Sequence, residues 1–215
     1  MSTLWLDTST VDTSLALLED GKILSLHVDQ ANALDFIFES LDATLEEAGQ
    51  EFADLEKIYY CCGPGSSLGL RIASMALRTW KVTHPKIELF AAYTLPVYAA
   101  LHAYRPEAPE AFTLLAQHRK DTWYKVRYAD NAVSEMSELS DGEVSDLEDA
   151  PLYHVRQRKF ATQPPSHSQP MEPNLAALPN VLLQSELFQL TPEPILFPAT
   201  APTFRKWTPE RHRKA

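Results

Sequence analysis

The chain has 215 residues, of which 45% are hydrophobic, so it can form one large domain or two small ones with a buried core. Its formal net charge of −10 argues against a protein that captures nucleic acid by overall charge. Two basic patches could make a local RNA contact, although such patches are more commonly solvated surface. They consist of His118, Arg119, Lys120, Lys125 and Arg127, and of a C-terminal group from Arg205 to Lys214.

The cysteines and the hydropathy argue for a cytoplasmic protein. Cys61 and Cys62 are adjacent on an expected strand, where successive side chains point to opposite faces, so a disulfide between them is geometrically poor. Neither has the spaced partners of a zinc site, and we expect both to be small core residues. No apolar run reaches about 18 residues and no signal pattern opens the chain, so no membrane partner is expected.

The first half predicts a mixed sheet with helices packed against it. Three strands are expected at Leu4–Leu6, Leu15–Leu18 and Ile23–Val28, the last two joined by a hairpin turn. A helix of about residues 31–49 follows, and Gly49 ends it. Strand and helix then alternate, with strands at 57–62 and 87–90 and helices at about 68–83 and 94–104.

The second half changes in composition. A second hairpin is expected from Phe112–Ala116 and Thr122–Tyr128, and residues 130–150 then hold eight Asp or Glu and no Lys or Arg. Eleven of the sixteen prolines lie from Pro151 onward. Because proline interrupts helices and central strands, we expect loops and short strands here, with residues 160–175 as a flexible linker.

Both long helices of the first half carry more apolar side chains than one face needs. In the first, Phe36 and Phe38 extend the apolar surface beyond one face. A helix lying on a sheet needs only one apolar face, so the surplus predicts a protein interface unless the helices are enclosed within the domain. The second helix has two such faces, one with Ile72, Met75, Ala76 and Thr79 and the other with Leu70, Ala73, Leu77 and Trp80.

A glycine-rich turn lies between the strand at 57–62 and the following helix. It reads Gly63-Pro-Gly-Ser-Ser-Leu-Gly-Leu-Arg-Ile72. Unpaired N–H groups at such a helix start suit an anion or a closely approaching backbone, but plain chain reversal is an equally common role. The spacing matches neither GxxxxGK[ST], because no Lys follows Gly69, nor GxGxxG.

A polar turn at Asp7–Thr10 ends the first strand and offers a carboxylate and hydroxyls for phosphate or Mg²⁺. The same residue types also satisfy turn backbone groups. The sequence contains neither a hydrolase elbow nor a HEXXH-type pairing of histidines, so no catalytic residue and no metal ligand are predicted. The candidate nucleotide-binding residues are Asp7, Thr8, Ser9, Gly63, Gly65 and Ser66.

These motifs together resemble those of the TsaB (YeaZ) family of tRNA threonylcarbamoyladenosine biosynthesis. The similarity rests on Leu6-Asp-Thr-Ser9, on Ser14–Gly21 and above all on the turn at Gly63–Ile72, where the family usually reads GPGSFTGLRIG. It is specific over about residues 1–105 and weak beyond, with a last similarity at Ala201–Arg205. The chain departs from the family at Ser67, Leu68 and Ala73, where Phe, Thr and Gly are usual.

The resemblance implies an α/β fold of the actin-like ASKHA (ribonuclease H-like) type, with two related halves. Residues 1–105 would be the first subdomain with the dimerisation helices, and residues 106–215 a reduced, proline-rich second one. It implies a non-catalytic subunit that forms homodimers, pairs with a TsaD-type transferase, works with a TsaE-type ATPase and meets tRNA indirectly. The implied interface residues are Ile37, Leu41, Gly69, Arg71, Ile72, Ala73, Ala76 and Trp80.

Two alternatives stay open. The chain could be a divergent paralogue with another partner. It could also be an actin-like nucleotide phosphotransferase or hydrolase that uses Asp7 and the turn at Gly63–Gly65. No cofactor is required by the sequence, and ATP or ADP with Mg²⁺ at a subunit interface is the one candidate.

Overall fold

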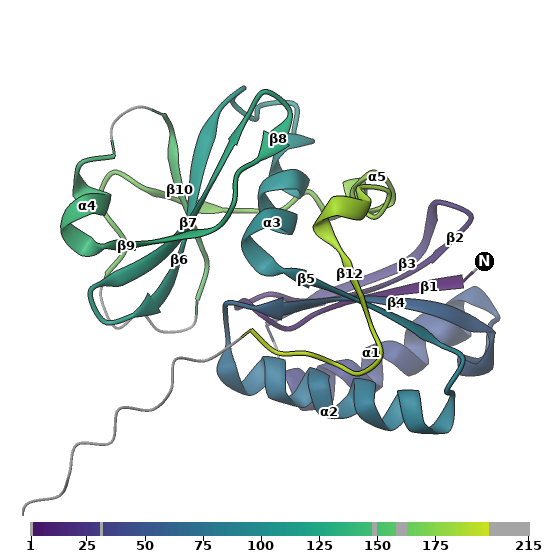
Figure 1. Ribbon diagram of the computed structural model, residues 1–215. Coiled ribbons are helices and arrows are strands. Elements are labelled where there is room, and N and C mark those ends of the chain that lie inside the picture. The colour runs from purple at the N-terminus through teal and green to yellow at the C-terminus, as the bar shows by residue number, and fades with distance from the viewer. Residues whose placement is uncertain (1, 31, 148–149, 158–162, 198–215) are drawn as a thin grey trace, which may run out of the picture.

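The computed structural model describes residues 2–30, 32–147, 150–157 and 163–197. They form two mixed β-sheets, one in each half of the chain, with helix α3 (Thr94–Ala103) between them (Figure 1). None of the helices in the described ranges is long and apolar enough to cross a membrane.

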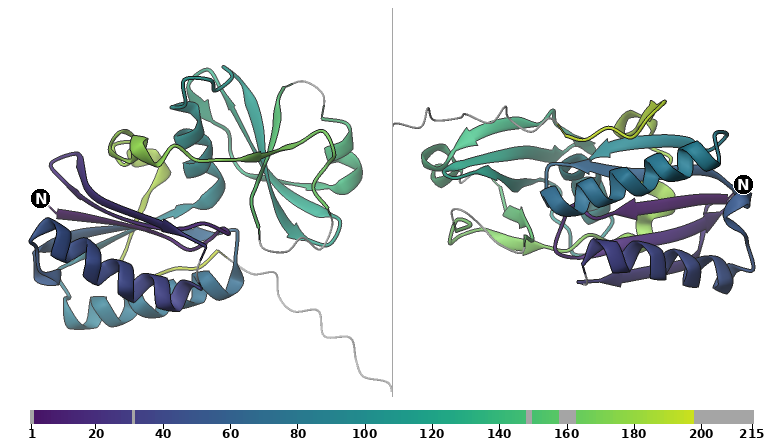
Figure 2. Two further views of the ribbon diagram at one scale, coloured as in Figure 1. Left: turned by 180° about the vertical axis from the view of Figure 1, so that it is seen from behind. Right: turned by 90° about the horizontal axis from the view of Figure 1, so that it is seen from below.

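The first sheet has the strand order β12-β5-β4-β1-β2-β3. Helices α1 (Ala33–Ala48) and α2 (Ser67–Thr83) cover one face, and α3 and the short α5 (Leu178–Val181) lie on the other (Figures 1 and 2). The strands are β1 (Ser2–Asp7), β2 (Thr13–Glu19), β3 (Lys22–Asp29), β4 (Leu55–Gly63), β5 (Glu88–Tyr93) and β12 (Gln189–Thr191).

Local sequence signals explain where the two long helices begin and end. The Asn32 side chain accepts hydrogen bonds from the N–H groups of Leu34 and Asp35 at the start of α1. Gly49 ends that helix in the left-handed conformation, with φ of 64°. The Ser66 hydroxyl accepts from the Gly69 N–H and caps α2. The expected helices at 31–49 and 68–83 are therefore confirmed.

The second sheet repeats the topology of the first on a smaller scale. Its order β11-β10-β6-β7-β8 corresponds to β5-β4-β1-β2-β3, with an antiparallel meander followed by parallel strands. The five-residue helix α4 (Asp141–Ser145) stands where the first half has α1. The strands are β6 (Phe112–Arg119), β7 (Thr122–Ala129), β8 (Ala132–Val133), β9 (Ser137–Ser140), which pairs with β7, β10 (Leu152–Val155) and β11 (Gln169–Met171).

The main core lies between the first sheet and helices α1 and α2. It includes Leu4, Leu17, Ile37, Ile58 and Leu77, all fully buried. Other clusters fill the opposite face of this sheet under α3 and α5, and the second sheet.

The C-terminal part of the chain differs from expectation in two places. Strand β12 returns to the first sheet and pairs with β5, so that sheet is completed from beyond the expected boundary at residues 105/106. Strand β11 lies inside the expected linker 160–175, of which residues 160–162 fall outside the described ranges. Short strands were expected in this half, but a strand of three residues leaves no periodic signal that would give its position.

Candidate functional site

The glycine-rich turn is occupied by the chain's own β1–β2 loop. The Ser66 N–H donates to the Ser9 carbonyl at 2.7 Å. A Cβ atom on Gly65 would lie 2.1 Å from the Ser9 carbonyl oxygen, and one on Gly69 would lie 2.3 Å from that of Thr8. The expected close approach of a backbone is therefore real, but the backbone belongs to the same molecule.

The C-terminal segment closes the other side of the turn. The Phe197 N–H donates to the Cys62 carbonyl at 2.7 Å. The Phe197 ring lies edge-on to those of Tyr93 and Tyr124, with centroids 5.4 and 5.1 Å away. A Cβ on Gly63 would approach the Phe197 side chain to 2.8 Å, and its φ of 114° also favours glycine.

The Asp7 carboxylate is used inside the protein. It is fully buried and accepts hydrogen bonds from the Ser9 N–H at 2.8 Å and the Tyr98 hydroxyl at 2.7 Å. Burial raises the pKa of Asp7 above its ordinary value, while the hydrogen bonds from Ser9 and Tyr98 oppose the rise. The Tyr98 hydroxyl also lies 3.1 Å from that of Thr10, so one buried network ties the β1–β2 loop to α3.

The second half also holds this loop. The Arg156 guanidinium donates to Asp12 at 2.8 Å, and the Val11 N–H donates to the Arg156 carbonyl. Thr8 and Ser9 are buried, and their hydroxyls have no hydrogen-bond partner among the described residues. The six candidate nucleotide residues thus cluster as the sequence indicated, but they mostly contact one another, and their nucleotide-binding role stays a prediction.

A Ser–His–Glu group on β3 and α1 has the residue types of a catalytic triad but not the geometry. The Ser25 hydroxyl donates to Glu47 and lies 3.0 Å from Nε2 of His27. Glu47 lies 3.3 Å from the same Nε2. A triad needs the serine and the acid on different ring nitrogens, so this group cannot relay a proton. Its hydrogen bonds join β3 to α1, and the one from Ser25 lowers the pKa of Glu47.

An apolar groove lies between α1 and α2. Its volume is about 300 Å³. Phe38 is 47% exposed and Met75 is 63% exposed. The lining consists of Leu34 and Phe38 from α1 and of Arg71, Ile72, Met75, Ala76, Thr79 and Trp80 from α2.

The structure divides the expected interface residues into two sets. Arg71, Ile72, Ala76 and Trp80 line the groove. Of the other four, Ile37, Leu41 and Ala73 are buried in the main core beneath it. Gly69 is buried against the Thr8 backbone at the start of α2. Of the two apolar faces of α2, the one with Leu70, Ala73 and Leu77 therefore packs inward and the one with Met75 faces outward. Sequence periodicity shows two faces but not which one the sheet covers.

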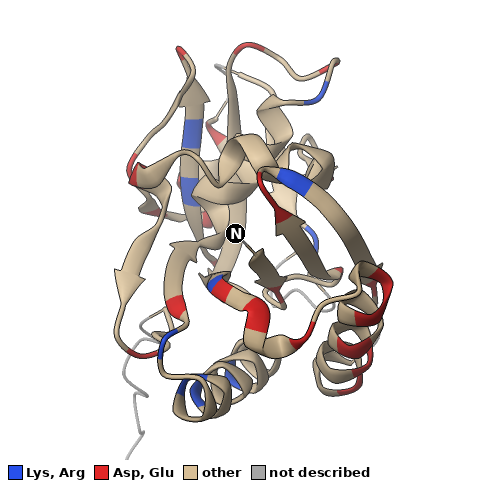
Figure 3. Ribbon diagram, turned by 90° about the vertical axis from the view of Figure 1, so that its right-hand side faces the viewer, with Lys and Arg blue, Asp and Glu red and all other residues tan. Residues whose placement is uncertain are grey.

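The two helices that line the groove carry opposite charges, and Figure 3 shows these charges by colour. The five charged residues of α1 are all acidic, and the three charged residues of α2 are all basic. They are Asp35, Glu39, Asp42, Glu46 and Glu47 on α1, and Arg71, Arg78 and Lys81 on α2.

Comparison with known proteins identifies the family. The sequence model described as "TsaD: tRNA N6-adenosine threonylcarbamoyltransferase" matches residues 32–140, about half of the chain, including α1, α2 and the glycine-rich turn. The chain belongs to this family. Among curated proteins, none matches the sequence significantly.

Two solved structures share the fold of this TsaD-family chain over nearly its whole length. An uncharacterized Pseudomonas aeruginosa protein with similarity to peptidase YeaZ superposes with a TM-score of 0.70 at 21% identity, covering 92% of this chain and 99% of its own. YeaZ from Pseudomonas aeruginosa superposes with a TM-score of 0.68 at 21% identity, covering 91% and 99%. These two likenesses confirm the expected α/β fold. The family match bears out the expected relationship to the threonylcarbamoyladenosine proteins.

Proposed function

We propose that this chain is a non-catalytic scaffold subunit in the threonylcarbamoylation of adenosine 37 of tRNA, and that it activates a TsaD-type transferase by binding it through the groove between α1 and α2. The observation that carries the proposal is the exposed apolar groove on the two helices. The family match supports the tRNA-modification context, because it includes both helices.

The spacing of exposed side chains on α2 suits a helical partner. Leu68, Met75 and Val82 are all exposed and recur every seven residues. A seven-residue apolar repeat forms a nearly straight ridge that packs into a facing helix pair. Leu34 and Phe38 form a parallel ridge on α1 at a spacing of four residues. Two helices from a partner would bury both ridges in a four-helix arrangement.

The charges favour a defined orientation of that partner. A second copy related by a two-fold axis can place its acidic α1 beside the basic α2 of the first, and a TsaD-type partner with the same polarity can do so equally. Because exposed ion pairs are screened by salt, we expect assembly to weaken as NaCl rises from about 0.05 to 0.5 M.

The alternative of a nucleotide phosphotransferase or hydrolase finds less support. Such an enzyme needs the Asp7 carboxylate turned toward a metal or a phosphate. Here both oxygens of that carboxylate accept hydrogen bonds from within the chain. A nucleotide would also require the β1–β2 loop and the glycine-rich turn to open. Arg156 binds the first through Asp12, and Phe197 binds the second through the Cys62 carbonyl.

The test is a binding measurement with a TsaD-type protein of the same organism. Calorimetry at micromolar concentrations should show a complex with the wild-type chain, and tRNA threonylcarbamoylation by the transferase should rise when the chain is added. The substitution Met75→Glu should weaken binding about 100-fold, because an unpaired carboxylate buried in an apolar interface costs about 3 kcal/mol. Ala76 is unsuitable for this purpose because it is buried in the main core.

The matched control is Leu183→Glu, which places the same charge at a leucine that is 82% exposed and follows α5 on the opposite face of the sheet. This variant should bind as the wild type does. If the wild-type proteins elute separately from a size-exclusion column, or if Met75→Glu and Leu183→Glu bind equally well, the groove is not the interface.

A further inference from the structure

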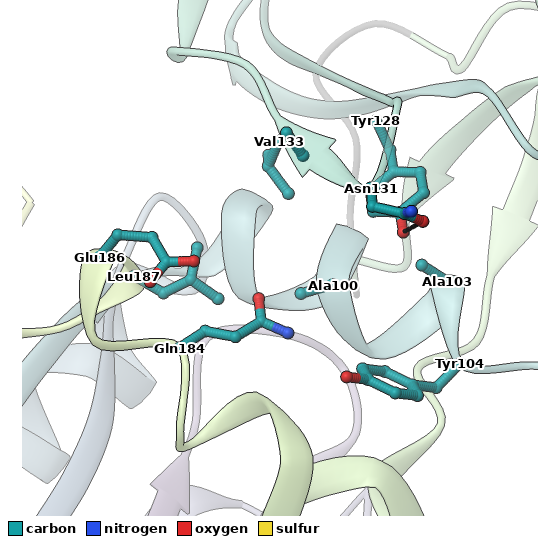
Figure 4. A pocket seen from close by; sticks show the side chains of 10 residues that line it. Ala100, Ala103, Tyr104, Tyr128, Asn131, Val133, Gln184, Glu186 and Leu187 are labelled. Carbon is teal, nitrogen blue, oxygen red and sulfur yellow. Dashed lines mark hydrogen bonds between the residues drawn. The ribbon is translucent and has the colours of Figure 1, made fainter.

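A pocket of about 360 Å³ with a mixed polar and apolar lining lies beside the second half of α3, away from the groove and from the glycine-rich turn. Three segments form it: the C-terminal turns of α3, the turn between β7 and β8, and residues 184–187 after α5. In Figure 4 the side chains of Tyr104, Gln184 and Glu186 point toward the space beside Ala100. The small side chains of Ala100 and Ala103 form the floor and leave this room.

The charged and polar groups of the lining are acidic, amide or phenolic, and the rest of the lining is aliphatic. Glu186 supplies a carboxylate, Gln184 and Asn131 supply amide oxygens, and Tyr104 and Tyr128 supply aromatic rings. The Tyr128 hydroxyl donates to Asn131 Oδ1 at 3.4 Å. A second hollow of about 480 Å³ continues from Tyr128 and Asn131 and adds Glu110 and Asp130. No Lys, Arg or His is among the described residues that line either hollow.

Such a lining selects against anions and for cations. A carboxylate at the mouth repels phosphate, and no cation is present to offset it. Ammonium and guanidinium groups are attracted both by a carboxylate and by the faces of tyrosine rings, at about 0.5–2 kcal/mol for each ring contact. Amide carbonyls accept the remaining N–H groups.

We propose that this pocket binds an organic cation, an ammonium or guanidinium group held by Glu186 and Gln184 beside Tyr104 and Tyr128. Two sources carry this chemistry. One is a free amine. The other is the chain itself, because residues 198–215 contain five Lys or Arg and one Glu.

By length alone, the sequence after Phe197 is long enough to span the distance to the pocket. Phe197 packs on Tyr93 at the start of α3, and the pocket lies near the end of that helix. A helix of ten residues is about 15 Å long. The eight residues from Phe197 to Arg205 span up to about 26 Å when extended. The length of the segment therefore does not distinguish a free amine from the chain's own residues, and an experiment is needed to do so.

The experiment titrates spermidine into the full chain by calorimetry. Glu186→Gln should weaken binding at least tenfold, and Tyr104→Leu several-fold. The matched control Glu193→Gln removes the same charge from an exposed glutamate seven residues later, outside the pocket lining, and should change affinity less than twofold. Equal affinities of Glu186→Gln and Glu193→Gln, or no binding in any full-length form, would overturn the proposal.

A full-length variant with the five cations of residues 205–214 replaced by glutamine separates the two sources. If the chain's own segment occupies the pocket, this variant should bind spermidine more tightly than the wild type. Fluorine NMR of fluorotryptophan-labelled protein should then show the Trp207 signal moving in Glu186→Gln but not in Glu193→Gln. If a free amine is the natural guest, spermidine affinity should stay unchanged and the Trp207 signal should not move.

Discussion

The start of helix α2 and its outer flank differ in what covers them. At its N-terminus, Gly65 and Gly69 approach the backbone of the β1–β2 loop so closely that no side chain fits. Along its outer flank, Met75 is 63% exposed beside an apolar groove. The chain's own backbone covers the first region, whereas no described part of the chain covers the second. The most distinctive motif of the sequence therefore builds the subunit, while the groove next to it is the part available to a partner.

The largest expected effect follows from the closed turn. In Gly65→Ala the new methyl group would lie 2.1 Å from the Ser9 carbonyl oxygen, which belongs to the backbone and cannot rotate away. We expect a loss of at least about 3 kcal/mol in the free energy of unfolding, measured by urea titration. In Gly142→Ala the methyl group meets nothing within 4 Å, and the loss should stay below about 0.5 kcal/mol. Similar stabilities of the two variants would show that the turn is open.

The outward and inward faces of α2 can be compared by the same measurement. Leu77 is fully buried, so Leu77→Ala should lower the free energy of unfolding by about 2–5 kcal/mol. Met75 is two residues away but faces the groove, so Met75→Ala should change it by less than about 0.5 kcal/mol in the free subunit. A comparable loss for Met75→Ala would mean that the subunit's own chain covers the groove.

The two faces of α2 also show which features could be predicted from the sequence and which could not. The strand and helix order of the first half, the cap at Gly49 and the surplus of apolar residues on α2 could all be predicted, because each has a local signal. The sequence could not predict which apolar stripe faces outward. Ile37 and Leu41 have the same helical periodicity whether a sheet or a partner covers them. The seven-residue spacing of Leu68, Met75 and Val82 is a hint to the outward stripe, but it becomes informative only when their exposure is known.

The contacts within the candidate nucleotide site also could not be predicted, because they join residues that are far apart in the sequence. Asp7, Thr8 and Gly65 have the residue types of a phosphate site, and only the tertiary structure shows Asp7 bonded to Tyr98, 91 residues away. The pocket beside α3 also brings together residues from three distant segments. Neither arrangement leaves a pattern in the sequence.

A smaller effect is expected at Asp7. Burial raises the pKa of this carboxyl, so its contribution to stability is fully present below the pKa of the unfolded chain and is lost as pH rises through the folded pKa. Asp7→Asn removes the titration, and Tyr98 can turn its hydroxyl toward Thr10. We therefore expect the variant to gain about 1 kcal/mol relative to the wild type for each pH unit between the two pKa values.

Urea unfolding of both proteins from pH 4 to pH 8 measures that difference. A variant whose stability relative to the wild type is independent of pH would show that Asp7 titrates normally, as an exposed metal or phosphate ligand would.

The most direct measurement is methyl NMR of methionine-labelled chain titrated with a TsaD-type protein. Met75 lies in the groove, while Met171 is buried in the second half and serves as an internal reference. The Met75 methyl signal should shift and saturate at one equivalent while the Met171 signal stays in place. Formation of a complex with the Met75 signal unchanged would show that the partner binds elsewhere.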